Sequence, residues 1–471
     1  MKLNGAFLAV LGVLSATSGA HAFDTGHHYD LTREALKELG MSEDAIQVAQ
    51  VENWLVDYYS NNPTRKDLEA DLSKLHFDNL NTTTKVRNYW GRLTVNTKKA
   101  VEDAAKAKNP MQVVALTGMS LHAVQDFYTH SNWVETHSTF SDAYSTRTWF
   151  DVPPPLTATK LVTGTYPNSS PVLSTNHGNY SVGMNHDSYC RPRWDEAYVY
   201  AYSASVQWVS AIEKWVSAVD PAVWAQAKKL SLGTINSAML KLDRVAAYKV
   251  SEWVASDGND GHWKGKGSGS KAEWYDFTVA WASGIDSIFV EHFKNDKWHQ
   301  ALTNNLHGNT PPATPVPSMP SRPLNKMAVR VRTSSIEELP VGLLEAKMDM
   351  AGTPDFLGQV TIDGQVFVEA MQINKSTIAP FWWSIKFVDA GRNKIDIVYD
   401  LFDEDSKISE VCDINPTVGK KKLEFSLSLF SDTVSGDISG SAGKRLTSEG
   451  VKGDNNRARI ALIVDSRRLR Q

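Results

Sequence analysis

The sequence predicts a multidomain α and β protein, with an N-terminal all-α domain followed by a C-terminal β-sandwich. All 13 histidines of the 471-residue chain lie at or before His307, and 13 of the 15 tryptophans precede residue 300. Residues 308–323 contain six prolines, which exclude a helix and favour an extended, semi-rigid spacer. The change in composition across this linker marks a domain boundary, and the chain is long enough for more than one core.

The first 22 residues are typical of a secretory signal peptide. A lysine at position 2 precedes the short apolar stretch 6–14, and Ala20-His21-Ala22 supplies a cleavage site of small residues. The apolar stretch is too short to anchor the chain in a membrane. We therefore expect a secreted or periplasmic protein whose mature chain starts near Phe23.

Residues 23–307 show the spacing and boundary signals of helices. Gly40 ends one helix, Ser42 caps the next, and Asn109-Pro110 and Asp220-Pro221 separate later ones. The expected helices cover residues 32–39, 42–59, 85–106, 111–130, 195–219, 222–255 and 271–302. Between them, 136–190 and 257–270 are rich in loop-forming residues, and loops of this length are often functional.

Residues 324–471 show the alternation of apolar and polar residues that strands require. β-Branched residues dominate these stretches, and clusters of turn-forming residues separate them. The expected strands cover residues 328–333, 357–362, 382–388, 394–399, 422–429 and 459–464. Several short strands of this kind, separated by turns, predict a β-sandwich.

The strongest local signal for function lies in the helix expected over residues 111–130. His122, Asp126 and His130 follow one another at intervals of four, so they share one face of the helix. Imidazole and carboxylate groups are common zinc ligands. The alternative is that these side chains form ordinary hydrogen bonds inside a core, which two helix histidines often do.

His122, Asp126 and His130 form a ridge along this helix face. Further candidate ligands precede the ridge, and their order along the chain is that of a known family. His28 follows the predicted mature N-terminus, Asp57 lies among aromatic residues, and His76 precedes Phe77-Asp78. With the ridge, these residues resemble the zinc-dependent phospholipase C and P1/S1 nuclease superfamily. The resemblance covers about 23–220 and is closest to bacterial proteins related to the fungal heterokaryon-incompatibility protein HET-C.

The resemblance implies a helical domain that holds two to three zinc ions. It implies that Phe23 binds zinc through its free amino group and carbonyl, and that Asp57 both bridges two ions and acts as the general base. Pro192 stands where a further histidine of the family would precede Glu196, so His186 takes that place in our assignment. The zinc ligands implied in this way are Phe23, His28, Asp57, His76, His122, Asp126, His130, His186 and Glu196.

The expected sandwich carries aspartates where its strands turn. The sequence Thr-Pro-Asp-Phe at 353–356 and the pair Asp403 and Asp405 resemble the calcium-binding loops of C2 domains. The resemblance implies a C2-like β-sandwich with a phospholipid membrane as partner and calcium ligands at Asp349, Asp355, Asp403, Asp405 and Asp413. The alternative is that these aspartates only stabilise turns.

The chain has two cysteines, one in each expected domain. Export permits a disulfide between Cys190 and Cys412, which would join the two domains, and two separate thiols are the alternative.

Together these features predict a secreted zinc-dependent phospholipase C. It would hydrolyse phospholipid phosphodiester bonds to diacylglycerol and a phosphorylated headgroup. One alternative is a nuclease or other phosphodiesterase on the same scaffold, although a net charge of −4 gives no basic footprint for nucleic acid. The other alternative is a non-catalytic membrane-binding or interaction protein.

Overall fold

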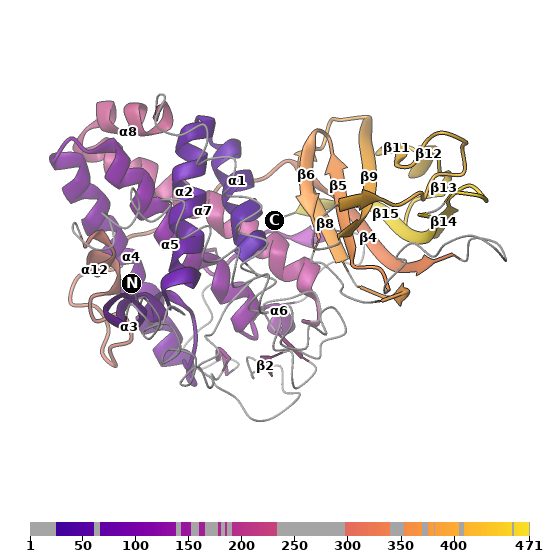
Figure 1. Ribbon diagram of the computed structural model, residues 1–471. Helices are drawn as coiled ribbons and strands as arrows, with labels where there is room; N and C mark the ends of the chain where they lie inside the picture. The colour runs from indigo at the N-terminus through magenta and orange to yellow at the C-terminus, as the bar shows by residue number, and fades with distance from the viewer. Residues whose placement is uncertain are drawn as a thin grey trace, which may run out of the picture.

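The N-terminal half of the protein is helical and the C-terminal part consists of antiparallel sheets, and the two lie side by side (Figure 1). This computed structural model describes residues 25–60, 66–137, 143–151, 160–164, 178–179, 184–185, 191–232, 297–339, 353–369, 375–380, 382–404, 409–454 and 456–470. Among these residues no helix is both long and apolar enough to cross a membrane.

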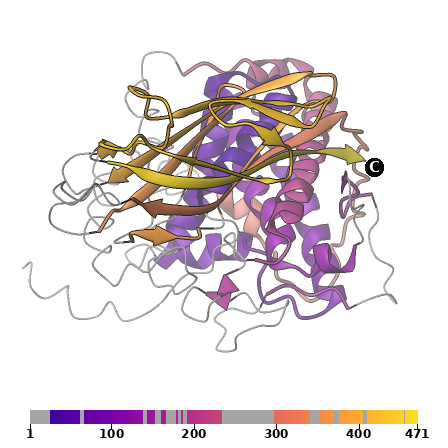
Figure 2. The same cartoon turned by 90° about the vertical axis from the view of Figure 1, so that its right-hand side faces the viewer.

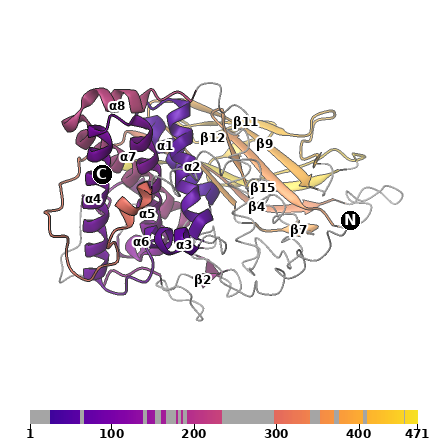
Figure 3. The ribbon, with the colours of Figure 1, turned by 60° about the vertical axis from the view of Figure 1, so that its left-hand side comes forward.

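The helical part is built around the buried helix α5. Every residue of α5 from Val113 to His130 is buried, and the helix packs against α2, α4 and α7 (Figure 3). The helices are α1 Thr25–Glu38, α2 Glu43–Ser60, α3 Lys66–Leu72, α4 Thr83–Lys106, α5 Pro110–His130, α6 Trp133–Thr136, α7 Trp194–Val219, α8 Pro221–Lys228 and α12 Trp298–Thr303, with a 3-10 helix at Ser73–Leu75.

The predicted boundary signals act as expected. Asn109 accepts a hydrogen bond from the backbone N–H of Gln112, so it caps α5 in front of Pro110. Asp220 caps α8 in the same way, ahead of Pro221. Gly40 has a φ of +70°, a left-handed conformation in which glycine avoids the strain of a side chain.

The helices differ from the prediction in several places. α1 begins at Thr25, seven residues earlier than expected, because the polar segment 27–30 is buried against neighbouring helices although it lacks an apolar period. α8 ends at Lys228, and residues 233–296 of the two expected long helices lie outside the described part. The short helices α3 and α6 were not predicted.

The C-terminal strands form two sheets. The first contains β1 Ala143–Ser145, β4 Lys326–Glu338, β7 Thr377–Ile378, β8 Trp382–Asp389, β14 Arg445–Glu449 and β15 Ala458–Arg470; β15 and β8 both pair with β4. The second contains β5 Phe356–Ile362, β6 Gln365–Val368, β9 Lys394–Glu404, β10 Ser409–Val411, β11 Leu423–Ser428, β12 Thr433–Gly436 and β13 Gly440–Ser441. A separate short ladder joins β2 Gly178–Asn179 and β3 Met184–Asn185.

The two sheets face each other across an apolar core. Thr333 of the first sheet and Tyr399 of the second share a hydrogen bond of 2.8 Å between their hydroxyls. A Cβ atom at Gly358 would lie 2.9 Å from the ring of Trp382, so this close approach requires glycine. The predicted β-sandwich is therefore present in the structure.

The helical part and the sandwich are joined by direct contacts. β1, which comes from the segment after α6, pairs in parallel with the end of β15 (Figure 2). Tyr202 of α7 stacks on Phe387 of β8 with ring centroids 3.7 Å apart. Arg330 of β4 donates to Asp195 of α7 at 2.9 Å. The two parts therefore share a packed interface.

The proline-rich linker forms no helix or strand, and it packs on the helices. Asn88 of α4 donates to the carbonyl of Asn309 at 2.7 Å, and Arg92 donates to the hydroxyl of Thr310 at 3.0 Å. A Cβ at Gly91 would meet Pro312 at 3.2 Å. The linker thus runs along α4 instead of standing clear of it.

Candidate metal centre

Five potential metal ligands meet inside the helical part. α5 supplies His122 and Asp126, one turn apart on the same face. α1 supplies His28, α2 supplies Asp57, and His76 directly follows the 3-10 helix. All five side chains are buried. Four separate segments of the chain thus place chemically similar groups in one interior position.

Asp126 is the centre of this cluster. Its Oδ1 lies 2.9 Å from Nε2 of His28, and its Oδ2 lies 3.2 Å from Nδ1 of His76. The same Oδ2 is 3.3 Å from Nε2 of His122. One carboxylate therefore contacts all three imidazoles.

Asp57 closes the other side of the cluster. Its Oδ1 lies 3.5 Å from Nε2 of His122 and 4.0 Å from Nδ1 of His76. The two imidazole nitrogens are themselves 3.2 Å apart. Two sets of three ligand atoms each gather within 4.8 Å, namely His28, His122 and Asp126, and Asp57, His76 and His122.

The donor set and its spacing fit zinc. Ligands at typical zinc distances in a tetrahedral site lie about 3.4 Å from one another, and most of the separations above are close to this value. Two buried carboxylates would also be costly without a compensating positive charge. A mixture of imidazole nitrogens and carboxylate oxygens suits zinc, whereas magnesium and calcium prefer oxygen ligands.

The second nitrogen of each imidazole has its own partner. Nδ1 of His28 lies 2.7 Å from Oε1 of Gln125, and Nδ1 of His122 lies 3.1 Å from Oδ1 of Asn53. Nε2 of His76 lies 3.1 Å from the hydroxyl of Ser60. Such partners fix the tautomer and the ring orientation, so the other nitrogen of each ring points into the cluster.

Asn53 and Gln125 belong to one buried network. The amide nitrogen of Asn53 donates to the hydroxyl of Thr32 at 2.9 Å and to Oε1 of Gln125 at 3.1 Å. The amide of Gln125 in turn donates to Thr32 and Ser205. The orientation of the two amides is therefore set by hydrogen bonds that connect several helices.

We expect the substitution Asn53→Ala to weaken zinc binding about 10- to 100-fold, because His122 loses the acceptor that orients its ring. The affinity is measured by competition with a chromophoric chelator. The matched control is Asn88→Ala, since Asn88 is also a buried helix asparagine but bonds to the linker. Equal affinities in the two variants would show that Asn53 does not orient a ligand.

His130, the last residue of the predicted ridge, faces a different carboxylate. Its Nδ1 lies 3.0 Å from Oδ1 of Asp78, and both side chains are buried. His130 is not in either set of three gathered ligand atoms among the described residues. The ridge therefore divides, with two of its members in the cluster and the third beside it.

Of the remaining predicted zinc ligands, only Glu196 lies among the described residues, and it is in neither set of gathered ligand atoms there. Glu196 accepts two hydrogen bonds from Arg193, at 2.8 and 2.6 Å, so its carboxylate already pairs with a guanidinium. Phe23 and His186 lie outside the described residues. His27, the neighbour of His28, packs on Trp194 instead, and burial together with the adjacent His28 lowers its pKa to about 3.

The structure brings together part of the predicted calcium set. Oδ1 of Asp403 accepts the backbone N–H of Asp355 at 2.8 Å, so these two residues are neighbours. Asp413 uses its two oxygens for the backbone N–H groups of Asn415 and Val451, at 3.0 and 2.8 Å, as a turn-stabilising aspartate does. Asp349 and Asp405 lie outside the described residues.

The predicted disulfide is not supported. Cys412 is a buried thiol in this structure, and burial raises its pKa. Cys190 lies outside the described residues. The contacts between the two parts of the chain are non-covalent wherever the structure describes them.

Sequence reasoning missed the groups that orient the ligands. Asn53 lies four residues before Asp57 on the same helix, and Gln125 directly precedes Asp126. The interval of four was a usable signal for Asn53, because it places both side chains on one face. Nothing local distinguishes Gln125 or Ser60 from ordinary polar residues.

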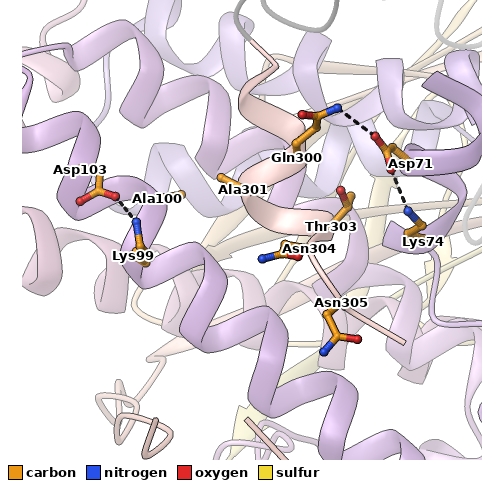
Figure 4. A pocket seen from close by; sticks show the side chains of 10 residues that line it. All are labelled: Asp71, Lys74, Lys99, Ala100, Asp103, Gln300, Ala301, Thr303, Asn304 and Asn305. Atoms are coloured by element: carbon orange, nitrogen blue, oxygen red, sulfur yellow. Dashed lines mark hydrogen bonds and ion pairs between the residues drawn. The ribbon is translucent and has the colours of Figure 1, made fainter. Parts of the chain in front are cut away.

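A separate surface pocket of about 570 Å³ lies between α3, α4 and α12 (Figure 4). Its charged groups pair with each other, as Lys74 does with Asp71 and Lys99 with Asp103. None of the predicted ligands lines it. The pocket is therefore distinct from the buried cluster.

Comparison with known proteins gives one family match. A family model described as the VWA7 N-terminal domain matches residues 38–148, less than half of the chain. The matched stretch contains Asp57, His76, His122 and Asp126, and it begins after His28. The match is not to a zinc phospholipase C family. The search of curated proteins found no match.

Three of the similar solved structures are distant from this chain. Human GIVD cytosolic phospholipase A2 is 12% identical over 32% of this chain and 17% of that chain, with a TM-score of 0.22. A structure of a C2 domain is 10% identical over 30% of this chain and 98% of that chain, with a TM-score of 0.19. A pair of C2 domains from Extended-Synaptotagmin 2 is 14% identical over 33% of this chain and 47% of that chain, with a TM-score of 0.21. The chain thus spans under a fifth of the phospholipase, and these scores are too low to establish a common fold.

Proposed function

We propose that this protein is a zinc-dependent phosphodiester hydrolase, and specifically a phospholipase C that acts at a lipid surface after export. The observation that carries the proposal is the buried cluster of His28, Asp57, His76, His122 and Asp126 with its oriented imidazoles. Structural polar groups in a core need one partner each, whereas here five ionisable groups converge on one another.

The residues of the cluster divide the chemical work. Zinc, when bound, polarises a phosphoryl oxygen and lowers the pKa of a bound water towards neutrality. His28, His76 and His122 would hold zinc through their inward-facing nitrogens, and Asp126, which contacts all three rings, would supply a negative charge. Asp57 makes the longer contacts, 3.5 Å to His122 and 4.0 Å to His76, and its carboxylate would accept the proton of the attacking water. Burial excludes bulk water, which strengthens each of these interactions.

An apolar side chain with lysines beside it supports the lipid assignment. Val418 is 81% exposed at the corner of a turn in which Lys420 donates its N–H to the carbonyl of Thr417. Gly419 has a φ of +82°, which a tight turn of this type requires. Three successive lysines at 420–422 follow, all of them exposed, and each also pairs with a carboxylate, those of Asp437, Asp454 and Glu424. A fixed apolar tip next to cationic side chains suits insertion between lipid headgroups.

This tip lies at the end of the sandwich toward the metal centre. Along the interface Glu38 pairs with Lys326 and Glu34 pairs with Lys386, so α1 runs in the same direction as β8. His28 therefore lies toward the Trp382 end of β8. The second sheet places the start of β11, and with it Val418, toward the same end.

We expect Val418→Asp to reduce binding to anionic phospholipid vesicles about tenfold, because a carboxylate at the tip opposes both insertion and attraction to the headgroups. Sedimentation with vesicles measures the effect. Phe430→Asp is the matched control, since Phe430 is 92% exposed just after β11, at the opposite end of that strand. If Phe430→Asp reduces binding and Val418→Asp does not, the other end of the sandwich faces the membrane. Repeating the binding with and without calcium tests the proposed role of Asp355 and Asp403.

The proposed reaction is tested by product analysis. Phosphatidylcholine vesicles should release phosphocholine and diacylglycerol with the zinc-loaded protein and not after removal of zinc by a chelator. Hydrolysis of single-stranded DNA without release of phosphocholine would instead assign a nuclease. Vesicle binding without any hydrolysis would indicate a non-catalytic membrane-binding protein.

A further inference from the structure

Helix α1 has two functional faces. His28 and Thr32 point toward α2 and α5, where His28 contacts Asp126 and Thr32 accepts hydrogen bonds from Asn53 and Gln125. Glu34 and Glu38 point the other way and pair with lysines of the sandwich. The helix that delivers one metal ligand is therefore also the helix that contacts the C-terminal domain.

The contact at Glu34 is buried and specific. Nζ of Lys386, on β8, lies 2.5 Å from Oε1 of Glu34 and 2.6 Å from Oε1 of Gln365 on β6. Lys386 is 6% exposed and Glu34 is 4% exposed. A buried ammonium group needs a partner of opposite charge in good geometry. Among the described residues Lys386 finds this carboxylate in Glu34, with α1 in this register.

Aromatic packing beside Lys386 reinforces this position. Phe387, the next residue of β8, stacks on Tyr202 of α7 with a centroid distance of 3.7 Å and lies 6.1 Å from Tyr198. Tyr198 in turn packs on His27 of α1, the neighbour of His28. β8 therefore contacts α1 directly through a charge and indirectly through α7.

We propose that the C-terminal sandwich is a structural part of the metal centre, with Lys386 as a positioning residue that holds α1 and thereby sets the place of His28. This inference rests on the proposed zinc site. A helix moves as a rigid element, and His28 lies less than two turns from Glu34 on the same helix. A shift of α1 on loss of the tether therefore moves the Nε2 of His28 relative to Asp126.

The test compares zinc affinity and ligand geometry in full-length variants. Lys386→Met is expected to lower zinc affinity about 5- to 150-fold, the usual range for coupling between two sites. It is also expected to change the visible absorption of the cobalt-substituted protein, which reports the arrangement of the ligands. Lys326→Met is the control, because Lys326 also pairs with α1, through Glu38, but lies at the edge beside the exposed Asp389.

Two further variants keep the test decisive if Lys386→Met fails to fold. The double variant Glu34→Gln with Lys386→Met removes both charges and leaves no buried charge without a partner, and it should show the same loss of affinity. Phe387→Ala removes the stacking without changing any charge, and it should show a smaller loss in the same direction. Wild-type zinc affinity and an unchanged cobalt spectrum in folded variants would overturn the inference. A wild-type protein that binds no zinc would instead refute the proposed function.

Discussion

Replacing Asp126 by asparagine should lower zinc affinity at least about 100-fold. This loss exceeds the loss expected when a residue that only orients a ligand, such as Asn53, is removed. Asp126 contacts His28, His76 and His122 at 2.9 to 3.3 Å, so it is the one carboxylate common to all three imidazoles among the described residues. Asparagine keeps the size of the side chain, but it loses the negative charge and one of the two acceptor oxygens. The positive charge of the metal then lacks its main counter-charge in a buried site.

The affinity of the Asp126→Asn variant is measured by chelator competition, with zinc per chain determined by elemental analysis. Asp103→Asn is the matched control, because Asp103 pairs with Lys99 and Lys106 on the surface of α4. If the Asp126→Asn variant bound zinc as tightly as the wild type, the cluster would be a set of hydrogen-bonded core residues.

Replacing Asp57 by asparagine should reduce phospholipid hydrolysis about 10²- to 10⁴-fold, the contribution of a well-placed general base. Asp57 makes longer contacts than Asp126, at 3.5 and 4.0 Å, so its loss should affect metal binding less than the loss of Asp126. Asparagine cannot accept a proton at neutral pH. The rate of phosphocholine release from vesicles measures the effect at saturating zinc.

Two measurements keep the interpretation of the Asp57→Asn variant clear. Vesicle binding should equal that of the wild type, because Asp57 is buried in the helical part whereas the exposed tip belongs to the sandwich. The far-ultraviolet circular dichroism should also be unchanged. Wild-type hydrolysis by this variant would exclude Asp57 as the base and would move the search to other residues near the metal.

Part of the buried cluster could be predicted from the sequence, because two of its residues have the spacing of a helix. His122 and Asp126 are four residues apart on a helix that the sequence predicts almost to the residue, and the structure places both in the cluster. The same rule included His130, which instead faces Asp78. Periodicity identifies the face of a helix, but it does not decide which partner each position along that face will meet.

The convergence of distant segments was suggested by the family resemblance, not by local pattern. His28, Asp57 and His76 come from three separate segments, and the structure brings their side chains beside His122 and Asp126 of α5. The beginning of α1 was missed, because the residues at 27–30 are polar yet buried. Their burial depends on residues distant in the sequence, such as Trp194, and the local sequence does not reveal these contacts.

In the sandwich, too, the features set by local sequence were predicted and those that depend on distant residues were not. The long alternating strands were predicted, but strands of two to five residues such as β12 and β14 give too few positions to show a period. β1 lies in a segment expected as loop and pairs with β15 more than 300 residues later. The ion pair between Glu34 and Lys386 joins residues 352 positions apart.

Zinc content of the purified wild-type protein tests the central claim most directly. A chain prepared with Phe23, the predicted mature start, at its N-terminus and dialysed against metal-free buffer should retain at least one and up to three zinc ions. A chelator that removes this zinc should abolish phosphocholine release, and added zinc should restore it. A protein that binds no zinc, and whose folding does not change when the chelator is added, would contradict the proposed zinc site. The five buried residues would then be core hydrogen-bonding groups.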